Sequence, residues 1–142
     1  MKTSKSSNQI TGNTGLFYVC YELSKRGWNV LPTSRNTVGI DIVIYNQDGS
    51  LKHTIQVKTL SKKAPIPLGK KPDYWIADLI MICLLDASIP KIYILSTNEI
   101  KEREDVKNQD HKGKAKGFWA VNNKRAWEEF SDKYLDNWDV LN

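Results

Sequence analysis

The segment Gly39-Ile-Asp-Ile-Val-Ile-Tyr45, Asn46-Gln-Asp-Gly-Ser50, Lys52-His-Thr-Ile-Gln-Val-Lys-Thr59 predicts a β-hairpin. Its first and third parts are rich in β-branched residues, which is typical of strands. Between them lies Asp48-Gly49, a dipeptide that favours the tight turns of hairpins. We therefore expect two antiparallel strands joined at these two residues.

The register of this hairpin follows from its turn. With Asp48-Gly49 as a two-residue loop, opposed positions have numbers that sum to 97, so Asp41 lies opposite Gln56 and Gly39 opposite Lys58. Opposed side chains share a face of the sheet, with Cβ atoms roughly 5 Å apart. Asp41, Gln56 and Lys58 are thus expected on one face. The other face is apolar and is expected to be core: Ile40, Ile42, Ile44, Ile55 and Val57.

Residues on either side of the hairpin predict further elements. Thr14 to Arg26 has apolar residues at helical spacing, with Asn13 or Thr14 as N-cap and Gly27 as the stop. The apolar stripe of this helix comprises Leu16, Val19, Cys20 and Leu23. Further strands are expected at 28–31, 75–85, 91–95 and 118–121, and further helices after the capping pattern at 96–99 and from 124 to 134, with Asn123 as cap. Polar or Lys/Pro/Gly-rich residues predict loops at 61–73 and 105–117.

This order of elements predicts an α/β sandwich with a central mixed β-sheet flanked by helices. A chain of 142 residues suits one domain with one sizeable core. We expect residues 1–12 to be a flexible tail and residues 13–142 to form the single domain.

Composition limits the class of protein. Hydrophobic residues make up 40% and charged residues 26%, as in ordinary globular domains, and no apolar run reaches bilayer-spanning length. The polar start lacks the apolar segment of a signal peptide, so cytoplasmic residence is expected. The two cysteines, Cys20 and Cys83, have apolar neighbours and are expected to be reduced and buried.

The polar face of the hairpin suits phosphodiester hydrolysis. The Asp41 carboxylate, the Gln56 amide oxygen and the Val57 backbone carbonyl are oxygen ligands that Mg²⁺ or Mn²⁺ accepts. Lys58 would stabilise negative charge on the phosphate or orient the attacking water. The alternative is structural: Asp41 and Lys58 form a half-exposed ion pair with Gln56 as a polar neighbour.

The net charge of +5 permits a polyanionic partner. The residues that could contact DNA phosphates are Arg35, Lys62, Lys63, Lys70 and Lys71. Such contacts carry no sequence information, and no motif for base recognition is evident. A second basic stretch follows at 107–116. Solvated surface lysines are the alternative explanation for both stretches.

Asp41, fourteen intervening residues and Gln56-Val-Lys58 resemble the pattern of PD-(D/E)xK nucleases. The likeness is nearest to the Mrr-like and Holliday-junction-resolvase-like branches, in which Gln often replaces the Glu, and it covers roughly residues 12–60. The resemblance implies a restriction-endonuclease-like fold and metal-dependent DNA cleavage. It assigns metal binding to Asp41, the Glu position to Gln56 and the catalytic lysine to Lys58. Small resolvase-like domains often act as symmetric dimers, so a homodimer is possible by analogy.

One position departs from this pattern. Many such nucleases carry a glutamate on the first helix, where this chain has Leu16. Asn13 lies one turn earlier on that face, and Glu22 lies about 120° round the helix. The chain thus has one assured carboxylate at the site, with Asp73, Asp78 and Glu99 as unplaced candidates for another.

Three functions follow as hypotheses. The first is a metal-dependent endodeoxyribonuclease. The second is a nuclease-fold module that has lost catalysis and binds nucleic acid, which Leu16 and Gln56 favour. The third is a protein-interaction domain, suggested by the tryptophans of the second half, although core packing is the more common use of a tryptophan.

Overall fold

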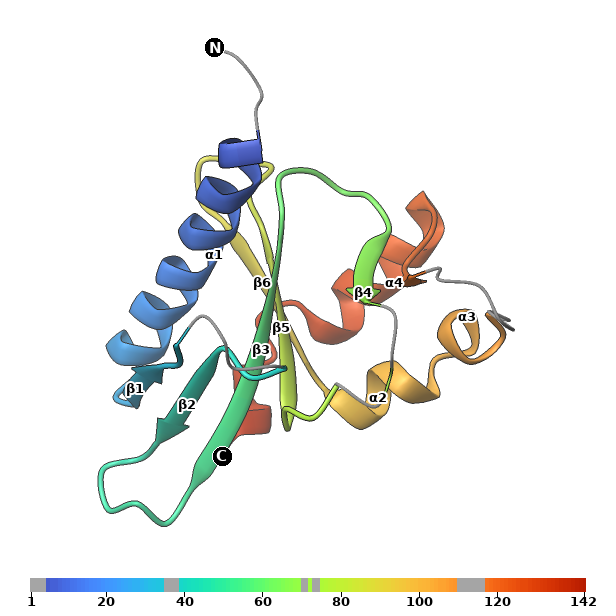
Figure 1. Ribbon diagram of the computed structural model, residues 1–142. Coiled ribbons are helices and arrows are strands. Elements are labelled where there is room, and N and C mark those ends of the chain that lie inside the picture. Colours follow the sequence, from blue (N-terminus) through green and yellow to red (C-terminus); the bar gives the residue numbers. More distant parts are fainter. Residues whose placement is uncertain (1–4, 35–38, 70–71, 73–74, 110–116) are drawn as a thin grey trace.

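The protein is built around a five-stranded mixed sheet (Figure 1). The computed structural model describes residues 5–34, 39–69, 72, 75–109 and 117–142, with side chains from residue 8. The strand order is β1-β2-β3-β5-β6, and only β3 and β5 run parallel within this described sheet. The bounds are β1 Asn29–Pro32, β2 Ile42–Tyr45, β3 Lys52–Leu60, β5 Leu79–Leu84 and β6 Lys91–Ser96. The predicted α/β architecture with a central mixed sheet is confirmed.

Helices cover both faces of this sheet. Helix α1 (Lys5–Lys25) lies on one face, and α2 (Thr97–Glu102) and α4 (Lys124–Tyr134) lie on the other (Figure 1). Beside α4 and the short α3 (Glu104–Lys107), a second, two-stranded sheet pairs β4 (Ile66–Gly69) with β7 (Phe118–Ala120). A 3₁₀ turn, η2 (Trp138–Leu141), follows α4. No described helix has the length and apolar character needed to cross a membrane.

Strand β5 separates two apolar clusters. All six of its residues are buried, as expected of a strand covered on both faces. Leu79, Met81 and Cys83 pack with Val19 and Leu23 of α1. The alternate residues Ile80, Ile82 and Leu84 pack on the α4 side, where the aromatic side chains gather: Trp75, Tyr93, Trp127, Phe130 and Tyr134. The two faces of one sheet thus each pack into a separate apolar cluster.

The hairpin forms in the predicted register. The pairs Ile42↔Ile55 and Tyr45↔Lys52 have numbers that sum to 97. The connection is longer than predicted, because Asn46 N–H donates to the Leu51 carbonyl at 3.0 Å and leaves residues 47–50 as the loop. A four-residue loop and a two-residue loop share this register, so the error in the turn does not displace the strands.

Helix α1 starts earlier than predicted. It begins at Lys5 rather than Thr14, and the Thr14 hydroxyl donates to the Ile10 carbonyl inside the helix, so the proposed cap there is wrong. Residues 5–12 of the expected tail are therefore helical. The stop is correct: Gly27 adopts a φ of 92°, which favours glycine. The predicted stripe faces the sheet.

The predicted helix caps after α1 are confirmed, whereas one of the predicted loops contains a strand. The capping box of Ser96 and Glu99 and the Asn123 cap are both present. β7 forms as predicted, but its partner β4 falls in a segment that was predicted to be a loop. The single-domain boundaries stay a prediction.

Candidate functional site

Asp41 lies one residue before the first ladder pair of β2, and its backbone is held on two sides. Its N–H donates to the Ile55 carbonyl at 2.8 Å, and its carbonyl accepts from the Thr33 N–H at 2.9 Å. The Thr33 hydroxyl donates to the carbonyls of Ile40 at 2.6 Å and Asp41 at 3.2 Å. Thr33 thus fixes the Asp41 backbone, a role that its sequence position after a strand did not reveal.

The Asp41 side chain binds the backbone of β3. Its Oδ2 accepts from the Val57 N–H at 2.8 Å. The described ladder ends at Ile42↔Ile55, before the predicted Asp41–Gln56 pair. The carboxylate therefore supplies the acceptor that a longer β2 would have supplied from its backbone. This bond fixes the carboxylate beside the middle residue of Gln56-Val57-Lys58.

The Val57 carbonyl lies on the same edge of β3 as the Asp41 carboxylate. A strand residue directs its N–H and C=O towards the same side, and alternate residues use opposite sides. The Leu60 carbonyl accepts from Leu85 N–H, so Leu60, Lys58 and Gln56 direct their backbone towards β5. Val57 then directs its backbone towards the end of β2.

Asp41 also lines a cavity of about 250 Å³ between α1 and β3. Val57 and Thr59 line it from β3, and Asn8, Gly12 and Leu16 line it from α1. Because side chains alternate along a strand, Gln56 and Lys58 leave β3 on the opposite face from Val57 and Thr59. Asp41 directly precedes β2 and lines this cavity with Val57 and Thr59, so the expected grouping of all three polar side chains on one face is not seen in this cavity.

The pKa of Lys58 depends on its burial and on the charge of Asp41. Burial lowers the pKa of the Lys58 ammonium, and the nearby Asp41 carboxylate opposes that fall. The neighbours of Lys58 and Gln56 on β5 are Ile82 and Ile80, which explains the loss of solvation. The structure thus places Lys58 within the electrostatic influence of the Asp41 carboxylate, beside apolar residues of β5.

The donor set fits a hard divalent cation only in part. The Asp41 carboxylate and the Val57 carbonyl are oxygen ligands on one edge, whereas the Gln56 side chain leaves from the other face of β3. Within the described ranges, no group of three or more His, Cys, Asp or Glu residues could hold a metal. One carboxylate and a carbonyl suit Mg²⁺ that keeps water and phosphate ligands. They do not suit a cation held by protein alone.

Helix α1 presents different residues to the site than the sequence suggested. Leu16 lines the Asp41 cavity. Asn13 is exposed and does not line this cavity, whereas Asn8 does. Glu22 lies away from it and pairs with Lys25 at 2.7 Å. Asn8 was missed because the helix was expected to begin after it.

The predicted phosphate contacts are described only in part. Lys62 and Lys63 are exposed in the segment after β3. Arg35, Lys70, Lys71 and Asp73 lie outside the described residues. Asp78 is engaged elsewhere, since its carboxylate accepts from Thr54 N–H at 3.0 Å. Glu99 belongs to the capping box of α2.

Comparison with known proteins finds a similar fold and no sequence match. No family model and no curated protein matches the chain. Among solved structures, the bacterial homing endonuclease I-Ssp6803I aligns with a TM-score of 0.60 and 12% sequence identity. The alignment covers 94% of this chain and 92% of that chain. The fold is therefore nuclease-like, and the likeness extends over nearly the whole chain.

Proposed function

We propose that this chain is a metal-dependent endodeoxyribonuclease of the PD-(D/E)xK type, nearest to the Mrr-like and resolvase-like branches. The observation that carries the proposal is the hydrogen bond from Val57 N–H to Asp41 Oδ2 in a nuclease-like fold. This bond of 2.8 Å directly connects the two parts of the motif, Asp41 and Gln56-Val-Lys58. The substrate in this proposal is DNA, which the basic net charge of the chain favours.

Each residue of the motif has a role in this proposal. Asp41 and the Val57 carbonyl would hold Mg²⁺ or Mn²⁺, and the Gln56 amide oxygen would be a further ligand. The bound cation supplies Lewis-acid polarisation of the scissile phosphate. Lys58 stabilises the charge that develops on that phosphate, and its apolar surroundings strengthen the interaction. Thr33 positions Asp41.

A catalytically impaired module that binds nucleic acid or a protein partner is the second candidate. Leu16 in the Asp41 cavity favours it, because Asp41 supplies the one carboxylate among the described residues that line this cavity. Cytoplasmic residence and a homodimer are expectations that accompany either function. Cutting both strands of a duplex would need two sites, which a symmetric dimer provides.

Cleavage of supercoiled plasmid with Mg²⁺ or Mn²⁺ tests the proposal. Asp41→Asn and Lys58→Ala should each lower the nicking rate about 100-fold or more. The matched controls are Asp48→Asn and Lys52→Ala, exposed residues of the same hairpin, and they should cleave like the wild type. A wild type that cuts no form of DNA with any of several metals would leave the impaired module as the function.

A further inference from the structure

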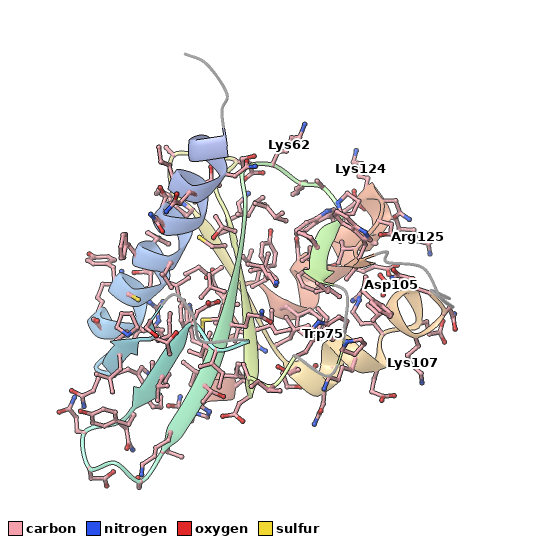
Figure 2. All side chains as sticks on the ribbon, viewed as in Figure 1. Lys62, Trp75, Asp105, Lys107, Lys124 and Arg125 are labelled. Carbon is pink, nitrogen blue, oxygen red and sulfur yellow. The ribbon has the colours of Figure 1, made fainter. Side chains whose placement is uncertain are left out.

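Three lysines from two distant parts of the chain lie on one surface. Lys62 and Lys63 follow β3, and Lys124 opens α4. Lys63 and Lys124 line the same cavity of about 220 Å³. The Trp127 indole N–H donates to the Ala64 carbonyl at 3.2 Å, which ties the two segments together. Figure 2 shows Lys62 and Lys124 projecting outwards at the same end of the molecule.

These three lysines are available to a partner. All are exposed, and within the described ranges none of them forms an ion pair. Many other described cations are already paired with carboxylates: Lys25, Arg26, Lys91, Arg103, Lys107 and Arg125. The junction of the β3–β4 segment and α4 therefore carries three lysines without a carboxylate partner among the described residues. We call Lys62, Lys63 and Lys124 the lysine surface.

The lysine surface is close to the Asp41 site through β3. Lys58 and Lys62 are four residues apart, which spans at most about 13 Å, because β3 ends at Leu60 and the chain bends after it. Duplex DNA carries a phosphate on each strand about every 3.4 Å of axis. A duplex with one phosphate at Asp41 and Lys58 therefore reaches the lysine surface within about four base-pair steps.

We infer that the lysine surface binds the phosphate backbone of duplex DNA beside the cleavage site, with α4 contributing Lys124. The inference rests on the proposed function, because it takes DNA as the substrate. It extends the predicted contacts, which lay between residues 35 and 71, to the far end of the chain. Phosphate contacts of this kind set the orientation of the duplex and carry no sequence information.

Salt-dependent DNA binding tests this inference. The full chain with Asp41→Asn is titrated into a fluorescent 20-base-pair duplex at several KCl concentrations without divalent metal. Replacing Lys62, Lys63 and Lys124 by alanine should reduce the slope of log K against log[KCl] by about 2 to 3, near 0.9 for each phosphate that a lysine no longer neutralises. The matched control removes equal charge elsewhere: Lys52→Ala, Lys101→Ala and Lys133→Ala. Replacing the three surface lysines by arginine should preserve the slope.

The outcomes separate this inference from the proposed function. It is overturned if the control triple variant loses as much slope as the surface variant, or if no DNA is bound at the lowest salt. If the wild type cleaves DNA and the alanine surface variant keeps its slope, the lysine surface fails while the nuclease proposal stands. If binding depends on the lysine surface and the wild type does not cleave, the nuclease proposal fails alone.

Discussion

Lys58 carries a partly buried charge, which lowers stability and which the proposed cleavage reaction would use. It is partly buried beside Ile82 of β5, and burial lowers the pKa of its ammonium below the ordinary value of 10.5. A buried charge is costly, and replacing it by an apolar side chain of similar length often stabilises a protein. A lysine retained in such a place indicates a use for its charge, and the Asp41 carboxylate nearby indicates where that use lies.

We predict that Lys58→Met raises the free energy of unfolding at pH 7 by about 1 kcal/mol while abolishing cleavage. Between the lowered pKa and 10.5 the unfolded chain binds more protons than the folded one, so wild-type stability rises with pH there. The advantage of the variant should therefore shrink from pH 7 to pH 10. Urea titrations at both pH values measure it.

Lys52→Met is the control for this stability prediction, because Lys52 is exposed on the same strand. It should change stability little at either pH. The account of Lys58 is wrong if Lys58→Met is less stable than the wild type at pH 7, or if its advantage grows towards pH 10.

At the scale of elements, the packing of α1 on β3 shapes the cavity beside Asp41. Gly15 is buried against Thr59, and a Cβ at Gly15 would lie 1.9 Å from the Thr59 hydroxyl. We predict that Gly15→Ala lowers the free energy of unfolding by about 1–3 kcal/mol, because α1 must move away from β3. Chemical denaturation measures the change.

Gly12 provides the matched control for Gly15. A Cβ there meets nothing within 4 Å, so Gly12→Ala should stabilise the helix by up to about 1 kcal/mol. Equal effects of the two substitutions would show that α1 does not approach β3 as closely as described.

The same cavity allows a second carboxylate to be added. Leu16 and Asp41 both line it, so Leu16→Glu would place two carboxylates at one site. We predict that Mn²⁺ binding, measured by calorimetry without DNA, tightens by at least about tenfold, since affinity follows the number of charged oxygen ligands. Without metal the variant should be less stable than the wild type, because the new charge is partly buried.

Phe17→Glu is the control for Leu16→Glu, since Phe17 is exposed on the next position of the helix. It should leave Mn²⁺ affinity unchanged. If both variants bind Mn²⁺ more tightly than the wild type, the cause is a general effect of charge. If neither variant does, the cavity is not a metal site.

Elements with strong local signals could be predicted from the sequence. The hairpin register depends on strand alternation and a turn, and both are local. By contrast, β4 contains Pro67 and Gly69, which mark loops, and it forms only because β7 pairs with it some fifty residues later. Asp41 lies off the expected face for a related reason. The ladder stops at Ile42, and the carboxylate then takes the place of the next backbone acceptor. Neither feature is encoded in nearby residues.

At the scale of the whole molecule, two cores share one sheet. β5 buries alternate residues on each face, so loss of this strand would expose both clusters at once. The site depends on this sharing, because Asp41 directly precedes β2 beside the α1-side cavity, Lys58 lies on β3 against β5, and their spacing is kept only while both layers remain packed. A single cooperative unit, as the expected domain organisation requires, should therefore unfold in one step.

We predict that probes on the two sides report the same urea midpoint. Cys83 reports the α1 side: it is fully buried, and burial raises its thiol pKa to about 11, so it should react with thiol reagents only after unfolding. Trp127 reports the α4 side, through the fluorescence of a variant in which it is the one remaining tryptophan. A Cys20→Ala background leaves Cys83 as the one thiol. Midpoints that differ beyond error would divide the chain into two independently unfolding layers and contradict the single domain.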